Sequence, residues 1–206
     1  WDDDWRPEFR VAAIPSYKAH RVAEEAEPEL DGESVPDELL PQVKLIEQIL
    51  QCAGIARLGM PGYEADDVIG SLASQTTDPV LVVTGDRDLL QLVDDAHGIR
   101  VLYTGKGGVR EPDIATQTYL QERYSVPTGE AYLEMSVLRG DTSDGLPGVK
   151  GIGDKTAAQL IAQYGSLAAL RAAIESGDPA IKGARRLNLE AASDYLDVAP
   201  TGVRVA

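Results

Sequence analysis

One short apolar run constrains the fold of this chain more than any other feature. Val80-Leu81-Val82-Val83 contains no polar side chain, and Pro79 and Gly85 bound it closely. A fully apolar run of this length is typical of a strand that is buried on both faces in a parallel sheet. The run therefore favours a fold in which helices cover a central sheet.

Strands and helices are expected to alternate around this run. Further strands are predicted over 55–58 and 100–104, and a helix with apolar residues at helical spacing begins near Pro41. A second helix is predicted over 64–74 and a helical turn over 88–93. This alternation predicts an α/β fold with a mostly parallel sheet.

The second half of the chain has a different pattern. From about Pro112 onward we expect only helices, over 113–124, 129–138, 154–164, 166–174 and 180–196. The chain is therefore expected to divide into an α/β core over 1–111 and a helical subdomain over 112–206.

The composition excludes several classes of protein. The chain has 206 residues, and 19 Lys and Arg against 34 Asp and Glu give a net charge of −15, which argues against a general nucleic-acid binder. One cysteine allows neither a disulfide framework nor a zinc-binding cysteine pair. No apolar run reaches the roughly 18 residues that span a bilayer, so we expect no membrane partner and a reducing cytoplasm.

The acidic residues fall into tight clusters. Two clusters follow the predicted strands over 55–58 and 80–84, and another lies in a glycine-rich loop. Ligands of open α/β sheets bind outside the carboxyl ends of the strands, so we expect the clusters to meet at one edge, and Asp2 joins them if Trp1 ends a strand. The clusters are Asp2-Asp3-Asp4, Glu64-x-Asp66-Asp67, Asp86-x-Asp88 and Asp141-x-x-Asp144.

So many carboxylates at one edge predict bound divalent metal ions. At an effective dielectric constant near 20, each like-charge pair about 4 Å apart costs roughly 4 kcal/mol unless cations or protons neutralise it. Oxygen ligands without Cys or His suit Mg²⁺ or Mn²⁺, and two such ions roughly 3.5–4 Å apart commonly serve phosphodiester hydrolysis. Any one acidic pair alone is more typical of a helix cap or a turn, so the combination carries this interpretation.

A glycine-rich segment over 147–158 forms a second candidate site. Its glycines allow a tight turn, and a helix follows whose free backbone N–H groups can bind an anion. We interpret the segment as a helix–hairpin–helix that grips a DNA phosphate; the alternative, a turn that merely joins two helices, is disfavoured by its basic residues. The candidate DNA-binding residues here are Gly148, Lys150, Gly151, Gly153, Lys155 and Thr156.

Four motifs occur in order along the chain: Pro61-Gly-Tyr-Glu64-Ala-Asp66-Asp67, Thr84-Gly-Asp86-Arg-Asp88-Leu-Leu-Gln, Gly140-Asp141-Thr-Ser-Asp144-Gly-Leu-Pro-Gly-Val and Gly151-Ile-Gly-Asp-Lys-Thr-Ala. They resemble the bacterial and phage 5′ nucleases, or flap endonucleases, which include the 5′→3′ exonuclease domain of bacterial DNA polymerase I. The resemblance covers nearly the whole chain. It implies a PIN-like core with a mostly parallel sheet flanked by helices, a helical arch over about 16–40, and a helix–three-turn–helix DNA clamp over 147–165.

The resemblance also implies a set of metal ligands. Acids at the matching positions would bind or surround two or more Mg²⁺ or Mn²⁺ ions, and a monovalent cation is expected at the helix–hairpin–helix. A further acid follows an apolar residue, where Asp2 fits best and Asp3 and Asp4 remain open. The implied ligands are Asp2, Glu64, Asp66, Asp67, Asp86, Asp88, Asp141 and Asp144.

Basic residues near the start of the chain match the base of the arch. In Tyr17-Lys18-x-x-Arg21, the resemblance implies that Lys18 and Arg21 are catalytic residues facing the scissile phosphate, and that all three side chains contact DNA. Because Lys18 and Arg21 are three residues apart, we expect them to share a helix face and to neutralise charge on that phosphate together. The acidic stretch over 24–33 departs from a phosphate-binding arch and predicts weaker affinity for DNA.

One expected segment falls outside the chain. The family begins with a strand that ends in a metal-binding Asp, some tens of residues before the position of Asp2, whereas the chain begins at Trp1. If the protein lacks that segment, the alternative function is a non-catalytic module that binds DNA junctions without the first metal ligand. A ribonuclease with a similar acidic core is a second alternative, which the duplex-binding clamp disfavours.

The expected function is a metal-dependent 5′ nuclease. It would hydrolyse phosphodiesters at 5′ flaps, nicks and 5′ ends of DNA, and remove RNA primers, in replication and repair. We expect a monomer in the bacterial cytoplasm, associated with the nucleoid. The preference between exonuclease and flap endonuclease stays open here, as does the choice between a free-standing enzyme and a polymerase domain.

Overall fold

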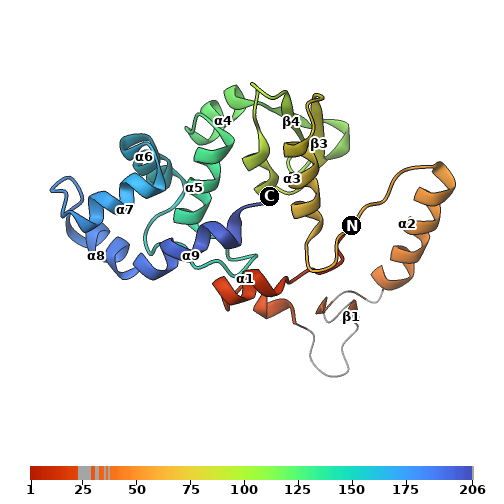
Figure 1. Cartoon of the computed structure of the whole chain (residues 1–206), viewed down its shortest axis with the longest axis horizontal. Coiled ribbons are helices and arrows are strands. Elements are labelled where there is room, and N and C mark those ends of the chain that lie inside the picture. The colour runs from red at the N-terminus through yellow and green to blue at the C-terminus, as the bar shows by residue number, and fades with distance from the viewer. Residues whose placement is uncertain (23–28, 31–32, 35, 37, 206) are drawn as a thin grey trace.

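The computed structural model describes residues 1–22, 29–30, 33–34, 36 and 38–205. Figure 1 shows a small sheet beside a larger helical region, with one helix standing apart. The helices are α1 (Glu8–Ala13), α2 (Leu39–Ala53), α3 (Ala65–Gln75), α4 (Gln117–Tyr124), α5 (Gly129–Arg139), α6 (Asp154–Tyr164), α7 (Leu167–Glu175), α8 (Gly183–Ala191) and α9 (Ser193–Val203), with short 3₁₀ turns η1 (Ala19–Arg21), η2 (Asp88–Leu92) and η3 (Gly108–Arg110). The strands are β1 (Glu29–Leu30), β2 (Glu33–Ser34), β3 (Val80–Thr84), β4 (Ile99–Tyr103) and β5 (Asp113–Ala115).

The sheet confirms the α/β class and corrects its details. β3 pairs with β4 in parallel, with Val80 opposite Ile99, as the alternating pattern predicts. β5 then pairs antiparallel to β4, so the expectation of helices only after Pro112 is wrong by one short strand. Three residues are too few to show an alternating pattern in the sequence. The expected boundary between residues 111 and 112 stays a prediction.

Two strand predictions around β3 are also wrong. Residues 55–58 form no strand, and Ile55 and Leu58 are 57% and 54% exposed. Burial of β3 on both faces is not observed, because Val82 is buried whereas Leu81 and Val83 are 54% and 59% exposed. α3 packs on β3 but leaves these two side chains more than half exposed.

α2 lies apart from the rest of the described structure. The apolar spacing that begins near Pro41 correctly predicts a helix, and Gly54 ends it in the left-handed conformation at φ 68°. None of its described residues is buried, and Leu45 and Ile49 are 56% and 65% exposed. Figure 1 shows α2 joined to the sheet region by an extended stretch of chain.

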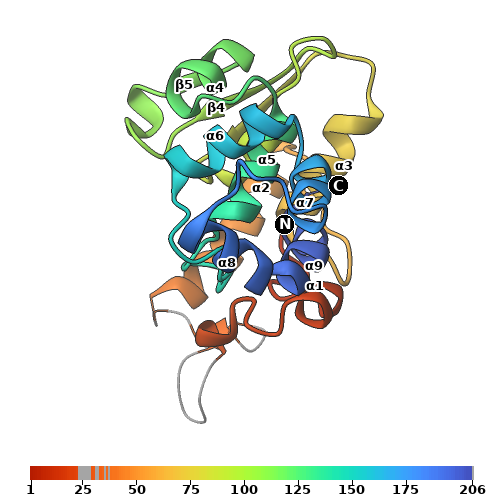
Figure 2. The ribbon, with the colours of Figure 1, turned by 90° about the vertical axis from the view of Figure 1, so that its left-hand side faces the viewer.

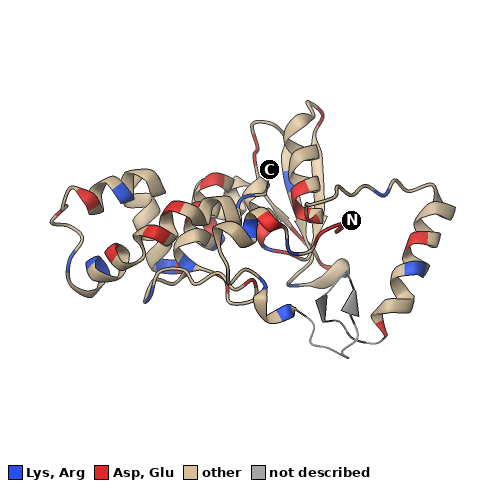
Figure 3. Cartoon of the chain, turned by 60° about the horizontal axis from the view of Figure 1, so that its bottom comes forward, with Lys and Arg blue, Asp and Glu red and all other residues tan. Residues whose placement is uncertain are grey.

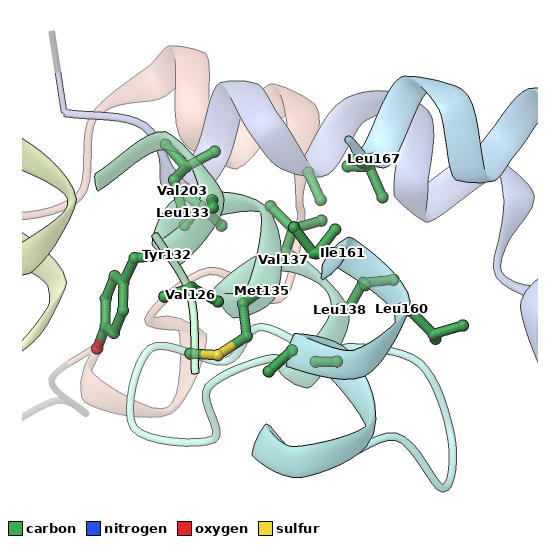
Figure 4. Close-up of a cluster of buried hydrophobic side chains, with 14 of the residues drawn as sticks. Val126, Tyr132, Leu133, Met135, Val137, Leu138, Leu160, Ile161, Leu167 and Val203 are labelled. Carbon is green, nitrogen blue, oxygen red and sulfur yellow. The ribbon is translucent and has the colours of Figure 1, made fainter. Parts of the chain in front are cut away.

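The helical region is built around α5, which Thr128 caps by accepting a hydrogen bond from the Ala131 N–H at 3.1 Å. Figure 4 shows α5 side chains packed against residues of α6, α7 and α9. Met135 and Leu138 are fully buried there. This packing confirms the expected helical half and places its core beside η2, which α5 also contacts.

The last predicted helix is two helices. The expected helix over 180–196 is interrupted at Ala192, where α8 ends and α9 begins. The break lets α9 turn back, so that it packs against α5 and α1. Figure 2 shows α9 alongside α1, which comes from the opposite end of the chain. The start of the α/β part is thus packed against the end of the helical part.

Part of the expected arch over about 16–40, residues 23–28, 31–32, 35 and 37, lies outside the described residues. Within the acidic stretch over 24–33, the structure describes only backbone pairing between β1 and β2, with Leu30 opposite Glu33. Among the described residues, no helix combines the length and the apolar character that a bilayer crossing demands.

The tight turn at Gly148 provides a test of the fold. Gly148 has φ 61°, and a Cβ there would lie 2.4 Å from the carbonyl oxygen of Arg139. We expect Gly148→Ala to lower the free energy of unfolding by about 2 kcal/mol or more, because it adds both left-handed strain and a backbone clash.

The matched control is Gly153→Ala in the same segment. A Cβ at Gly153 meets nothing within 4 Å, and its φ of −104° suits any residue. Thermal unfolding followed by circular dichroism should show a loss of less than about 1 kcal/mol for the control. Equal losses in the two variants would contradict the turn geometry.

Candidate functional site

Acids from four segments come within electrostatic reach of one another near the ends of β3 and the start of α3. Burial is the largest cause that raises the pKa of Asp66, and the charges of Asp86, Glu64 and Asp2 follow it. For Asp88, burial again comes first, followed by the charges of Asp86, Asp144 and Asp141. Figure 3 shows acidic residues on several neighbouring segments around the start of the chain. The predicted convergence at one edge is therefore observed.

Asp66 and Asp88 have no neutralising partner of their own. Burial and like-charge neighbours raise the pKa of each to about 7. In the part of the chain that the structure describes, neither carboxylate takes part in a hydrogen bond or ion pair. Partly buried carboxylates that face other carboxylates are the arrangement that binding of a cation relieves.

Glu64, in contrast, is held by several groups. Its carboxylate accepts hydrogen bonds from Lys18 Nζ and, at 2.7 Å, from the Tyr17 hydroxyl, and it pairs with Arg10 Nη1 at 2.7 Å. Burial still raises the pKa of Glu64, with Lys18 and Arg10 acting in the opposite direction. Only 5% of the residue is exposed. The contacts with Tyr17, Lys18 and Arg10 fix its position from three sides.

Asp67 turns away from solvent toward Arg10. Its two oxygens accept hydrogen bonds from Arg10 Nη1 and Nη2 at 2.7 and 2.6 Å, and it caps α3 by accepting the Glu64 N–H at 3.1 Å. Glu64 and Asp67 therefore form a capping box at the start of this helix.

The loop after α5 brings two more acids to the same edge. Burial disfavours the charged form of Asp141, but hydrogen bonds from Ser143 and Arg87 outweigh it and hold the pKa of Asp141 below its usual value. Asp144 pairs with Arg21, whose Nη2 lies 2.8 Å from Oδ1. A backbone bridge between Asp141 and Leu146 closes this loop.

Lys18 and Arg21 reach the acids by a different route from the expected one. The prediction that they share a helix face is wrong: Lys18 has φ 47° and precedes the single 3₁₀ turn η1. Its backbone N–H donates to the Asp144 carbonyl at 2.9 Å while its Nζ binds Glu64. Both contacts of Lys18 depend on this bend. Lys18 and Arg21 therefore bind two different acids of the same edge, Glu64 and Asp144.

The first acidic cluster separates into three environments. Asp2 Oδ1 accepts the Ala65 N–H at 2.6 Å, which places Asp2 at the N-terminus of α3. Asp4 instead accepts the Arg6 N–H, and the Asp3 carboxylate lies against Gly59. Asp2 is thus the member of the cluster that lies beside Asp66. The sequence placed Asp2 there on the condition that Trp1 ends a strand, and Trp1 does not.

The donor set suits a divalent cation, but the acids are spaced apart. Among the described residues, no three His, Cys, Asp or Glu side chains lie close enough to hold a metal ion as they stand. Several of the acids are paired with Lys or Arg, and Asp86 accepts the Asp88 N–H at 2.8 Å. All the available ligands are carboxylate oxygens, which fit Mg²⁺ or Mn²⁺ in chemistry. The individual ligand assignments stay predictions.

The glycine-rich segment over 147–158 forms a loop that is held in place by buried residues. Val149 and Ile152 are buried, and the Val149 N–H donates to the Leu138 carbonyl at 2.9 Å. Asn188 Nδ2 donates to the Lys150 carbonyl at 2.9 Å. The buried residues and these backbone hydrogen bonds therefore hold the loop in its shape, and its exposed residues do not.

The outward side of this loop is exposed. Gly151 has φ 76°, and Lys150, Gly153 and Lys155 are exposed at the start of α6. No side chain among the described residues caps this helix, which leaves its first N–H groups open to an anion. Lys155 and Arg123 also line one open groove. The DNA-binding role of these residues stays a prediction.

Arg10 is the site residue that the sequence did not single out. It is 2% exposed and contacts both Glu64 and Asp67. In the sequence it is one basic residue in a stretch of several, and nothing in the local pattern shows that it is buried. Arg87, which binds Asp141, lies within a quoted motif but also had no predicted role.

Comparisons with known proteins identify the family. One family model, described as the N-terminal resolvase-like domain of 5′-3′ exonuclease, matches residues 1–125. A second, the C-terminal SAM fold of 5′-3′ exonuclease, matches residues 127–204. The chain belongs to the 5′-3′ exonuclease family. The resemblance stated from the motifs is thereby confirmed, and the expectation of a 5′ nuclease is confirmed at the level of this family.

Relatives with the family name match the whole chain. A 5′-3′ exonuclease of Streptomyces coelicolor is 55% identical over all of this chain and 67% of its own length. One of Mycobacterium tuberculosis is 52% identical over all of this chain and 66% of its own length. The chain thus spans about two thirds of these relatives. The DNA polymerase I of Thermus aquaticus is 38% identical over 85% of the chain and 19% of that protein.

Solved structures share the fold at low sequence identity. The T5 D15 protein crystallised with metal ions matches 95% of the chain and 69% of its own, with a TM-score of 0.73 and 20% identity. The catalytic core of Rad2 in complex with a DNA substrate matches 92% and 56%, with a TM-score of 0.52 and 16% identity. Both similarities establish the fold.

Charge crowding at Asp88 predicts a stability effect in the metal-free protein. The pKa of Asp88 is about 7 in the folded chain and near 4 when unfolded, so stability is lost as pH rises from about 4 to 7. Asp88→Asn removes this loss, and we expect it to raise Tm by about 3 °C or more at pH 8 in EDTA.

The same measurement at lower pH tests the cause. Near pH 3 the difference in Tm between Asp88→Asn and the original chain should disappear, because this pH lies below the pKa of Asp88 in both states and both then hold the proton. Asp94→Asn is the control, since His97 holds the pKa of Asp94 below its usual value and its loss should not stabilise the chain. A pH-independent gain at Asp88 would contradict charge repulsion.

Proposed function

We propose that this chain is the nuclease part of a divalent-metal-dependent enzyme that hydrolyses phosphodiesters at 5′ ends and branched junctions of DNA. The proposal rests on the gathering of Asp66 and Asp88, which form no ion pair with any described residue, with acids of two other segments. Two basic side chains, Lys18 and Arg21, border the same acids. Unpaired carboxylates that could bind metal cations, next to two basic side chains that could bind a phosphate, suit a metal-assisted reaction at a phosphate.

The acids would hold two or more Mg²⁺ or Mn²⁺ ions. Asp66, Asp86 and Asp88 would supply ligands from α3 and η2, while Asp141 and Asp144 would supply them from the opposite loop. Such ions lower the pKa of water and stabilise the leaving oxygen. Asp2, Glu64 and Asp67 would bind or surround them from the start of α3.

Lys18 and Arg21 would neutralise the scissile phosphate. Both now bind carboxylates, Lys18 on Glu64 and Arg21 on Asp144. When cations occupy the acids, these pairs weaken and the two side chains become available to the phosphate oxygens. Tyr17, whose hydroxyl donates to Glu64, would keep that carboxylate ionised and oriented. Catalysis would then consist largely of orientation and charge neutralisation.

The glycine-rich loop would hold the duplex by its backbone. Exposed N–H groups at the start of α6 and the side chains of Lys150 and Lys155 form a phosphate-binding surface without any base-reading group. Thr156 lies in the first turn of that helix. A monovalent cation at the loop is part of this proposal.

The names of similar proteins support the substrate class. The Streptomyces coelicolor and Mycobacterium tuberculosis relatives are named 5′-3′ exonucleases, and the Rad2 core was solved with a DNA substrate. We extend this to 5′ flaps, nicks and RNA primers in bacterial replication and repair, acted on by a cytoplasmic, nucleoid-associated monomer. The non-catalytic alternative is not favoured, because both of these relatives match the whole chain and are named 5′-3′ exonucleases.

Cleavage of a 5′-end-labelled flap duplex tests the proposal directly. We expect short 5′ products with Mg²⁺ or Mn²⁺ and none with EDTA, and Asp86→Ala or Asp141→Ala should slow cleavage by about 100-fold or more. Glu175→Ala, at an exposed position on α7, is the control and should cleave at the original rate. Unchanged cleavage by either site variant would exclude these acids from the reaction.

A salt titration tests the clamp. Binding of a flap duplex is measured in Ca²⁺ at several salt concentrations, where each lost phosphate contact lowers the slope of log affinity against log salt by about 1. Lys155→Ala should lower the slope in this way and weaken binding alike for different sequences. Lys182→Ala, exposed at the start of α8, is the matched control, and an equal slope change there would contradict a specific clamp.

A further inference from the structure

Arg10 connects the two carboxylates at the start of α3 to the end of α9. On one side of its guanidinium, Nη1 lies 2.7 Å from both Glu64 Oε2 and Asp67 Oδ2, and Nη2 donates to Asp67 Oδ1 at 2.6 Å. On the other side, Nε donates to the Gly202 carbonyl at 3.1 Å and Nη2 to the Arg204 carbonyl at 3.2 Å. One buried side chain thus bridges acids and backbone.

The fit around this bridge leaves little room for movement. α1 carries Arg10 and packs against α9, where a Cβ at Gly202 would lie 2.6 Å from Ile14 Cδ1. The carbonyls at a helix C-terminus carry partial negative charge and accept the remaining guanidinium N–H groups. The planar fork of an arginine can serve both partners at once, which a lysine cannot.

Gln91 fixes the same segment, residues 202–205, to η2, the turn that carries Asp88. Its Nε2 donates to the Asp88 carbonyl at 2.9 Å and to the Val203 carbonyl at 3.0 Å, and its Oε1 accepts the Val205 N–H at 2.9 Å. The 202–205 segment is therefore bound on one side to Arg10 and α3, and on the other to η2. It spans the two elements that carry Asp66 and Asp88.

We propose that Arg10 and Gln91 are positioning residues that use the 202–205 segment to set the distance between the acids of α3 and those of η2. This inference rests on the proposed metal-dependent function. Neither side chain touches the reacting atoms; Arg10 acts through Glu64 and Asp67, and Gln91 through the backbone of Asp88. Loss of such supporting groups commonly costs about 10–100-fold in metal affinity.

Mn²⁺ binding to the full chain without DNA, measured by electron paramagnetic resonance, tests the inference apart from activity. We expect Arg10→Lys to raise the dissociation constant about 10-fold and Arg10→Met to raise it further, toward 100-fold. Gln91→Leu, which keeps the volume but breaks both bonds to the segment, should raise it at least about 3-fold. Circular dichroism establishes that each variant is folded.

Arg204→Ala is the matched control. It removes a surface ion pair with Glu130 but keeps the carbonyl that Arg10 binds, so Mn²⁺ affinity should stay within about two-fold. Folded Arg10→Lys and Gln91→Leu variants that bind Mn²⁺ like the original chain, with only Tm changed, would overturn the positioning role alone. No Mn²⁺ binding by the original chain would overturn the proposed function, and this inference with it.

Discussion

Mutual repulsion among carboxylates is the constraint on which the rest of this structure depends. Acids from the start of the chain, α3, η2 and the loop after α5 share one partly buried edge, and a folded chain keeps them there only at a cost. Basic side chains offset this repulsion at some of the acids and not at others. Glu64, Asp67, Asp141 and Asp144 each have an arginine or lysine partner, whereas Asp66 and Asp88 have none among the described residues. The uncompensated pair is where a bound cation would relieve the most repulsion.

The basic residues around the acids therefore have two distinct kinds of role. Arg10 is buried and serves the fold of the site, because its partners are fixed carboxylates and backbone carbonyls. Lys18 and Arg21 lie closer to solvent and exchange partners more readily, which suits groups that meet a phosphate. A single count of ion pairs would treat these residues alike, although their burial separates Arg10 from Lys18 and Arg21.

The sequence predicted those parts of the site that depend on local spacing. The i, i+3 relation of Glu64 and Asp67, the position of Asp86 and Asp88 after an apolar strand, and the anchored glycine loop all follow from short-range rules. Arg10 could not be found this way, because its partners lie 57 and 192 positions further along the chain. The strand expected over 55–58 failed for a related reason: a short apolar stretch becomes a strand only when a neighbouring strand pairs with it. Lys18 departs from the helix expected for it because its bend is set by the Asp144 carbonyl, which is also remote in sequence.

The bridge between Arg10 and Gly202 also bears on how the molecule acquires its structure. Contacts across 192 positions form only after synthesis, which proceeds from the N-terminus, has passed α9. The sheet and α3 can condense earlier from nearer contacts, but their acids gain a fixed spacing only when α9 docks. A nascent chain would thus hold most of the nuclease half in place without an organised acidic edge. Docking of α9 would give this folded intermediate a defined acidic site.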